Sequence, residues 1–159
     1  MSYETTMHAR DAVSAKLASL YLIKGNERYL LIQAKSFEAK IEKDKKEIGI
    51  LGRSMKGNKS AGAKGSGSFT IYQNTPLFTD MLKVQSATGE DHYFDLMVVN
   101  EDPTSEAGRQ IVTFKDVNLN GGTVASFDAD GETLEQAMDF TFEGMEIIEK
   151  FQMLPGMKQ

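Results

Sequence analysis

The chain has 159 residues and a formal net charge of -5 at pH 7, with 40% hydrophobic and 26% charged residues. A chain of this length buries roughly 70% of its unfolded surface, which is enough for one domain with an ordinary core. The absence of cysteine excludes thiol catalysis, iron–sulfur clusters and disulfides, and the acidic balance argues against general affinity for nucleic acid. No apolar run approaches the roughly 18 residues that span a bilayer, so we expect no membrane insertion by the monomer.

The N-terminal part of the sequence predicts a terminal arm followed by two strands. Residues 1–19 are polar with scattered apolar positions, which is typical of a loose arm or a short helix. Apolar and β-branched residues then flank a Lys-Gly-Asn-Glu turn within residues 20–34, and this is the pattern of a β-hairpin. We therefore expect an N-terminal arm at 1–19 and a folded domain that begins at residue 20.

Residues 36–42 alternate strictly between the two faces of a strand. The apolar face carries Phe37, Ala39 and Ile41. The opposite face carries Glu38, Lys40 and Glu42. We therefore expect one face of this strand to pack in the core and the other to face water.

Residues 53–67 are rich in glycine, serine and lysine, and they lie in a stretch without any acidic residue between Glu47 and Asp80. Such a tract buries too little apolar surface to offset the entropy lost on ordering. We therefore expect a mobile loop of about fifteen residues between two strands, ordered only against a partner. The side chains expected to make that contact are Arg53, Met55, Lys56, Lys59 and Lys64. The tract indicates assembly rather than catalysis.

The segment that follows residue 74 predicts a helix. Thr75 can cap the helix, and Pro76 suits the first helical position. An apolar stripe then follows, formed by Leu77, Phe78, Met81 and Leu82. We expect this helix to lie against a sheet.

The rest of the sequence predicts further strands and a short tail. Residues 92–99 are apolar enough for a central strand, and residues 110–119 predict another. An Asn-Gly-Gly turn then predicts a hairpin partner at 123–127. Residues 139–148 have the pattern of one strand with a bulge at Gly144. The domain is expected to extend to residue 151, with a C-terminal tail at 152–159.

Acidic side chains concentrate in residues 128–149, where eight of them occur without any lysine or arginine. This charge is opposite to that of residues 53–67. Two surfaces of opposite charge on one chain favour head-to-tail contacts between copies, and such contacts build rings and filaments. We expect Asp128 and Asp130 to take part in these contacts. Two separately solvated surfaces are the alternative interpretation.

The sequence contains no motif that predicts a catalytic, metal or cofactor site. The glycine tract lacks the Gly-Lys-Ser/Thr triplet of a phosphate-binding loop, and it leads into a strand. The two histidines are His8, in the expected terminal arm, and His92, at the edge of a predicted strand, and this placement predicts neither a paired-histidine metal site nor a triad. Asp128 and Asp130 lack the further oxygen ligands that calcium requires. We expect no enzyme activity and no cofactor; an enzyme with a concave polar site is the alternative.

The order of these features resembles the tail tube protein family of contractile phage tails. The likeness runs through residues 20–34, 36–43, 51–59, 65–67, 69–72, 112–118 and 140–143. It covers nearly the whole domain and is weaker in residues 1–19 and after Phe151. The resemblance implies a mainly β fold, an antiparallel sandwich or barrel with one flanking α-helix and a long β-hairpin loop.

The resemblance also implies a structural role in a particle. Subunits would form hexameric rings, stacked into a hollow tube inside a contractile sheath, with residues 53–67 packed against an adjacent ring. The implied partners are further copies of the chain, the sheath, the baseplate and the tail terminator, with transient passage of DNA. Such a protein is part of the virion and is assembled in the host cytoplasm. Tubes of type VI secretion-like systems and R-type bacteriocins are the alternatives.

Joining of sheets edge to edge would satisfy the hydrogen-bonding groups that an open sheet leaves unpaired. A channel for DNA must be hydrated without binding phosphates tightly. In such a ring we therefore expect the channel to be lined by Glu38, Lys40 and Glu42.

Overall fold

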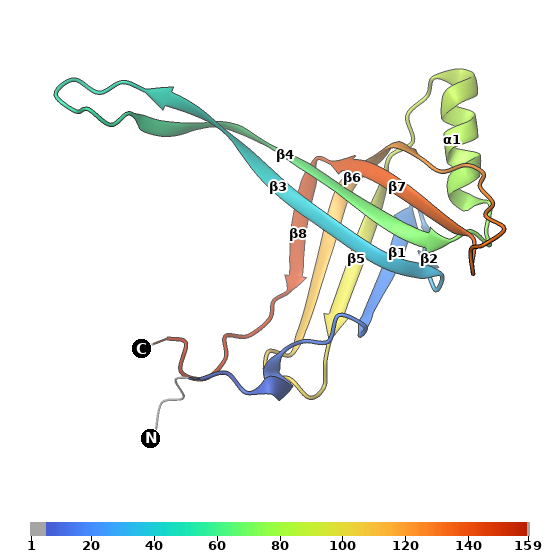
Figure 1. The fold of residues 1–159 in the computed structure, drawn as a ribbon, viewed down its shortest axis with the longest axis horizontal. Coiled ribbons are helices and arrows are strands. Elements are labelled where there is room, and N and C mark those ends of the chain that lie inside the picture. Colours follow the sequence, from blue (N-terminus) through green and yellow to red (C-terminus); the bar gives the residue numbers. More distant parts are fainter. Residues whose placement is uncertain (1–5, 159) are drawn as a thin grey trace. The chain divides into compact units, whose positions relative to one another are not determined.

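The computed structural model describes residues 6–158, which form two compact units (Figure 1). Unit 1 contains the chain up to Ile32, Phe94–Lys115 and the segment from Met145 onwards. Unit 2 contains Gln33–Tyr93 and Asp116–Gly144. Antiparallel strands dominate both units, and one α-helix, α1 (Leu77–Thr88), belongs to unit 2. The prediction of a mainly β, antiparallel fold with one α-helix is confirmed.

Unit 1 is a sheet with the strand order β2-β1-β5-β6, in which β8 also pairs with β6. Its strands are β1 (Ala18–Lys24), β2 (Glu27–Leu30), β5 (Phe94–Glu101), the first half of β6 (Arg109–Gly122) and β8 (Gly144–Glu149). The predicted first hairpin is confirmed, since Lys24 pairs with Glu27 around a Gly25 with φ 61°. Alternate side chains of this sheet form the core of the unit, among them Leu20, Leu22, Phe94, Leu96 and Phe114.

The segment before β1 is tied to unit 1 by hydrogen bonds. A short 3-10 helix, η1 (Ala9–Asp11), ends at the buried Asp11. The carboxylate of Asp11 accepts a hydrogen bond from the Glu106 backbone N–H at 3.2 Å, and its carbonyl accepts one from the Ser105 hydroxyl at 2.8 Å. In the described part of the predicted N-terminal arm, residues 9–11 form a short 3-10 helix held on unit 1, and residues 18–19 already belong to β1 (Ala18–Lys24).

Unit 2 has the strand order β6-β7-β4-β3. Its strands are β3 (Ala34–Ile48), β4 (Gly57–Tyr72), β7 (Glu135–Phe142) and the second half of β6. Three buried aromatic rings form the centre of its core: the Phe69 centroid lies 5.0 Å from that of Phe78 and 5.8 Å from that of Phe140. Since Phe78 belongs to α1, this cluster holds the helix against the sheet, as the apolar stripe predicts.

The helix begins one residue later than predicted. Pro76 is the N-cap and Leu77 is the first helical residue. Thr75 makes no regular side-chain cap, because its Oγ1 lies a long 3.4 Å from the N–H of Leu77. The helix ends where Gly89 adopts φ 73°, a left-handed conformation that glycine tolerates without strain.

Two glycines of β4 allow aromatic side chains of β7 to lie directly on the backbone. A Cβ at Gly65 would clash with the Phe142 ring, and a Cβ at Gly67 would clash with the Phe140 ring and the Glu38 carbonyl oxygen. Phe140 also stacks on Phe37 of β3, with centroids 5.6 Å apart. The glycines of this tract therefore have a packing role.

The structure corrects the prediction of a loop over residues 53–67. Strand β4 begins at Gly57, and residues 57–67 pair with β3 in a continuous ladder that contains one bulge. The turn occupies only residues 49–56. The prediction from composition was wrong because it considered only the burial of apolar side chains. A β-ladder satisfies the hydrogen-bonding groups of the backbone without any apolar side chain.

Two other strand predictions were wrong. Residues 123–127 are not a strand, and β6 instead continues to Gly122 and pairs with β7. The Asn-Gly-Gly sequence is the site of a bulge after Leu119 and of close packing of Gly122 on Met138, rather than of a turn. Residues 139–148 belong to two strands, because the chain leaves β7 at Glu143 and starts β8 at Gly144.

Replacement of Gly67 by alanine tests the packing role of the β4 glycines. We expect Gly67→Ala to lower the free energy of unfolding by about 1–3 kcal/mol, because a backbone oxygen and an aromatic ring must both move to admit the methyl group. Urea denaturation followed by circular dichroism measures this change. Gly49→Ala is the matched control, since no atom lies within 4 Å of its added Cβ. Equal urea midpoints for the two variants would contradict this interpretation.

Candidate assembly surfaces

Strands β3 and β4 continue beyond the other strands of unit 2 as a two-stranded ribbon (Figure 1). From Gly65 to Tyr72, β4 pairs with β3 on one side and β7 on the other. Before Gly65 its recorded partner is β3 alone. We call residues 42–64 the hairpin arm. All of its residues except Gly57 are exposed, so backbone pairing within the ribbon is its main internal support.

The tip of the hairpin arm is a tight turn that presents apolar side chains to solvent. The Arg53 N–H donates to the Ile50 carbonyl oxygen at 3.1 Å, and Gly52 has φ 83°. Glycine with positive φ at the third position is typical of a type II turn. Leu51 at the apex is fully exposed, and the nearby Met55 is 77% exposed. An apolar tip of this kind is normally covered by a partner.

The hairpin arm is also basic, with seven lysines and arginines against three acidic residues. It includes the predicted contact residues Arg53, Met55, Lys56, Lys59 and Lys64, all of which are exposed. Lys56 lies 3.8 Å from Glu47, but both side chains are solvated and such a pair stabilises the ribbon little. The surplus positive charge is therefore available to a partner.

A second surface of unit 2 carries the opposite charge. Residues 123–134 connect β6 to β7, and we call them the acidic loop because they contain Asp128, Asp130 and Glu132 and no basic residue. The Asp128 carboxylate accepts a hydrogen bond from the Asp130 N–H at 3.0 Å, and the Gly131 N–H donates to the Asp128 carbonyl at 3.1 Å. These bonds form a local turn with both predicted carboxylates exposed. Phe127 beside them is 95% exposed.

Two glutamine side chains hold the acidic loop at its base. The fully buried Gln136 donates from Nε2 to the Thr123 carbonyl at 2.7 Å and to the Thr79 hydroxyl at 3.0 Å. Gln73 donates from Nε2 to the Val124 carbonyl at 3.1 Å. The Gln73 N–H also donates to the Leu134 carbonyl at 2.9 Å. Both ends of the loop are therefore fixed on the body of unit 2.

The hairpin arm and the acidic loop lie at opposite ends of the β3–β4 ladder (Figure 1). The tip joins Ile48 to Gly57 at one end, whereas the acidic loop enters β7 beside Tyr72 at the other. Fifteen residue steps at about 3.3 Å each separate Gly57 from Tyr72 by about 50 Å. The structure therefore does not bring Arg53 and Lys56 near Asp128 and Asp130 within one chain.

The predicted polar stripe of β3 is part of a wider polar face in unit 2. Glu38, Lys40 and Glu42 are exposed, and their cross-strand neighbours on β4 are Ser68, Ser66 and Lys64. On β7, Asp139 and Thr141 extend the same face. Lys40 lies 3.1 Å from Glu42, and its hydrogen bond and charge, together with the charge of Lys64, lower the pKa of Glu42. The face is hydrated and mixed in charge.

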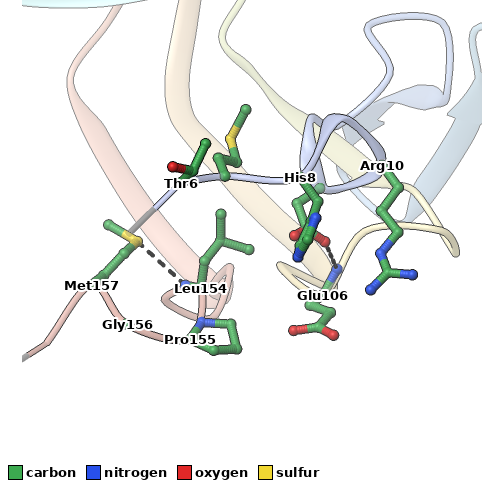
Figure 2. A pocket seen from close by; sticks show the side chains of 10 residues that line it. Thr6, His8, Arg10, Glu106, Leu154, Pro155, Gly156 and Met157 are labelled. Atoms are coloured by element: carbon green, nitrogen blue, oxygen red, sulfur yellow. Dashed lines mark hydrogen bonds between the residues drawn. The ribbon is translucent and has the colours of Figure 1, made fainter. Parts of the chain in front are cut away.

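Unit 1 contains a hollow of about 290 Å³ between residues 6–11, Glu106 and residues 154–157 (Figure 2). Its apolar side includes Leu154, Pro155 and Met157, and its polar side includes Arg10 and Glu106. The Gln152 N–H donates to the Ala107 carbonyl at 2.8 Å and so fixes the C-terminal segment there. The predicted tail at 152–159 therefore has, in its described part, an ordered contact with unit 1.

Among residues 6–158, no helix has the length and apolar character needed to cross a membrane. Within the same residues, histidines and acidic residues form no cluster of three or more that could hold a metal ion.

Sequence comparisons connect the chain with tail proteins. A family model described as "Phage tail tube protein" matches residues 5–149. The chain is 39% identical over 144 residues to the phage-like element PBSX protein XkdM of Bacillus subtilis (strain 168), which covers 91% of this chain and 95% of XkdM. It is 38% identical, with the same coverage, to the uncharacterized protein YqbM of the same strain.

Solved structures with a similar fold include a chain of an extracellular contractile injection system and Hcp1 of Flavobacterium johnsoniae. The sheath/tube terminator complex of an extracellular contractile injection system, PVC, in its extended state contains a chain that matches with a TM-score of 0.66 and 12% identity, over 86% of this chain and 96% of that one. Hcp1 of Flavobacterium johnsoniae matches with a TM-score of 0.52 and 14% identity, over 83% and 94%. At these identities the likeness is one of fold.

Removal of the Lys40 charge tests the electrostatics of the polar face. A lowered carboxyl pKa means that the interaction stabilises the folded chain above the ordinary pKa of glutamate and is lost as the pH falls through the folded-state value. We expect Lys40→Met to raise the pKa of Glu42 toward its ordinary value, as measured by NMR titration of the carboxyl carbon. Lys45→Met, at a lysine that does not contribute to this pKa, is the control and should leave it unchanged. An unchanged pKa in Lys40→Met would show that the ion pair does not form in solution.

Proposed function

This chain belongs to the phage tail tube protein family, and we propose from that premise that its copies form hexameric rings that stack into the hollow tube of a contractile tail. As a tail tube protein it is a structural part of the particle and not an enzyme. The observation that carries the proposed stacking is the placement of an apolar, basic tip and an acidic loop at opposite ends of one ladder. Surfaces of opposite charge at opposite ends of a subunit favour repeated head-to-tail contacts.

Within a ring, we propose that subunits join through the edges of their sheets. In unit 1, the recorded pairings leave β2 and β8 each with a single strand partner. Both strands expose apolar side chains, among them Leu30 on β2 and Ile147 and Ile148 on β8. Pairing with a neighbouring subunit would satisfy the open backbone groups and bury these side chains together. Ring closure would also prevent uncontrolled edge association.

Between rings, the hairpin arm would contact the acidic loop of a subunit in the next ring. The arm contributes Arg53, Met55, Lys56, Lys59 and Lys64, and the loop contributes Asp128 and Asp130. Exposed ion pairs are worth about 0–1 kcal/mol each, so their main effect is to set register and direction. Burial of apolar side chains at about 25 cal/mol per Å² would supply most of the association energy.

The polar face of unit 2 is the proposed lining of the channel. Glu38, Lys40 and Glu42 lie on it beside serines of β4. Mixed charges that already pair with one another, as Lys40 does with Glu42, would hydrate the channel without holding phosphates tightly. This arrangement suits the passage of DNA or the penetration of a cell envelope by the tube.

The proposed partners are the sheath, the baseplate and the tail terminator, with assembly in the cytoplasm of the bacterial host. Solved chains of similar fold belong to a sheath–tube complex, a baseplate and a tube-terminating cap, which supports these partners. The relative at 39% identity belongs to a phage-like element, and this favours a phage-type tail over a secretion tube. A bacteriocin-like particle remains the second candidate, since a tail-tube fold serves both.

Shortening of the hairpin arm tests the stacking proposal. Replacement of residues 44–62 by Asn-Gly joins Lys43 to Ala63, which pair across the ladder, through a two-residue turn. We expect this variant to keep the circular dichroism spectrum of the folded chain but to form no long tubes in negative-stain electron microscopy. Lys83→Ala, at an exposed position of α1, is the control and should assemble normally.

The two possible failures of this experiment have different meanings. Tubes of normal length from the shortened variant would exclude the hairpin arm as the stacking element. Failure of the unaltered chain to form rings or tubes at any concentration would instead contradict the proposed tube.

A further inference from the structure

Phe127 is an aromatic side chain with almost no cover from its own chain. It is 95% exposed on the acidic loop, immediately before Asp128. Val124 in the same loop is also exposed, at 53%. An exposed phenylalanine beside exposed carboxylates combines an apolar contact with a local negative charge. Such a combination fits a partner that is apolar at its centre and basic around it.

The acidic loop presents Phe127 from a fixed base. Gln136 and Gln73 hold the carbonyls of Thr123 and Val124, and the turn at Asp128 orders the chain on the other side of Phe127. A loop that is already ordered loses little conformational entropy when it binds. An aromatic side chain that becomes buried at the centre of an interface can carry a large share of the binding energy.

The tip of the hairpin arm has the complementary composition. Leu51 stands at the apex of the Ile50–Arg53 turn, and the exposed Met55 lies close to it in the sequence. Arg53 lies between these two apolar side chains in the sequence, and Lys56 follows Met55. The tip therefore exposes apolar side chains together with basic ones, and this complements the exposed apolar and acidic side chains of the acidic loop.

We propose that Phe127 is the anchor for the hairpin arm, and that its ring packs against Leu51 and Met55 of a second copy of the chain. Asp128 and Asp130 would then face Arg53 and Lys56 around this apolar contact. The inference rests on the proposed stacking and adds to it the contact that provides its affinity. Charge and composition do not single out Phe127 and Leu51, because their exposure is visible only in the structure.

The occupant must be a second copy and not the same chain. Phe127 and Leu51 belong to surfaces at opposite ends of the β3–β4 ladder, separated by about 50 Å. Charge complementarity between an acidic loop and a basic tip selects another copy, because every copy carries both surfaces. If a partner of another kind covers Phe127, the experiments below will show it.

Engineered cysteines test the contact directly, since the chain has no cysteine of its own. Two single variants, L51C and F127C, are mixed with unaltered chain, allowed to form tubes, and treated with a short bifunctional maleimide. We expect a cross-linked dimer on a denaturing gel only when both variants are present in the same tubes. A mixture of L51C and M153C is the control, because Met153 is 74% exposed but lies outside the acidic loop.

The energetic role of the anchor is tested by truncation. We expect F127A to raise the critical concentration for tube formation roughly tenfold or more, because it removes most of the apolar contact. F127L keeps much of that area and should restore most of the assembly. L51A combined with F127A should raise the critical concentration less than the product of the two single effects, as two residues in contact do. Circular dichroism checks that each variant is folded.

The outcomes separate this inference from the proposed function. Tubes that form normally and give no L51C–F127C dimer would overturn the anchor contact while leaving the tube intact. Loss of sheath attachment in F127A without a change in the critical concentration would overturn it as well, and would assign Phe127 to a different partner. Absence of any tube from the unaltered chain would overturn both proposals.

Discussion

The antiparallel pairing of β3 with β4 is the interaction on which the rest of unit 2 depends. In its inner part the ladder is one layer of a packed sheet, in which Gly65 and Gly67 let Phe142 and Phe140 lie on the backbone. In its outer part the same ladder leaves the sheet and becomes the hairpin arm. Because one pair of strands forms both the core and the arm, the direction of the arm is set by the packing of the core. A ribbon of this kind can present its tip at a defined place without any apolar support of its own.

In the proposed stacking, the two ends of that ladder would divide association between charge and apolar contact. The basic arm and the acidic loop would attract each other weakly across solvent, which would select the head-to-tail orientation and disfavour contacts between like ends. The apolar groups at each end, Leu51 and Met55 on the arm and Phe127 on the loop, are few and concentrated. A small apolar contact of this kind is weak for one pair of subunits, and becomes strong when six subunits of a proposed ring engage at once. This arrangement would keep free subunits apart and make stacked rings stable.

The sequence allowed much of the fold to be predicted, because most of the relevant signals are local. Alternation at residues 36–42 identified β3 and its exposed polar face, and the Gly25 turn identified the first hairpin. The expected buried face of β3 was wrong in part, because Phe37 and Ala39 are only half-buried and Ile41 is 51% exposed where the ladder leaves the rest of the sheet. Residues 123–127, at the start of the acidic loop, were wrongly predicted to be a hairpin strand, because Asn-Gly-Gly is a good turn signal. The close approach of Gly122 to Met138, which explains the glycine, is visible only in three dimensions. The β4 tract was misread for a related reason, since composition cannot distinguish glycines that make a chain flexible from glycines that admit a neighbouring ring. The basic residues of the arm were found from charge alone, whereas Leu51 and Phe127 could not be selected without knowing that they are exposed.

The most direct test of the central claim is a helical reconstruction by electron cryo-microscopy of the assemblies that the purified chain forms. If copies of this chain complete one another as proposed, the map will show stacked rings of six subunits, each hairpin arm reaching a subunit of the adjacent ring. Density for a compact particle whose hairpin arms touch no neighbouring copy would contradict it.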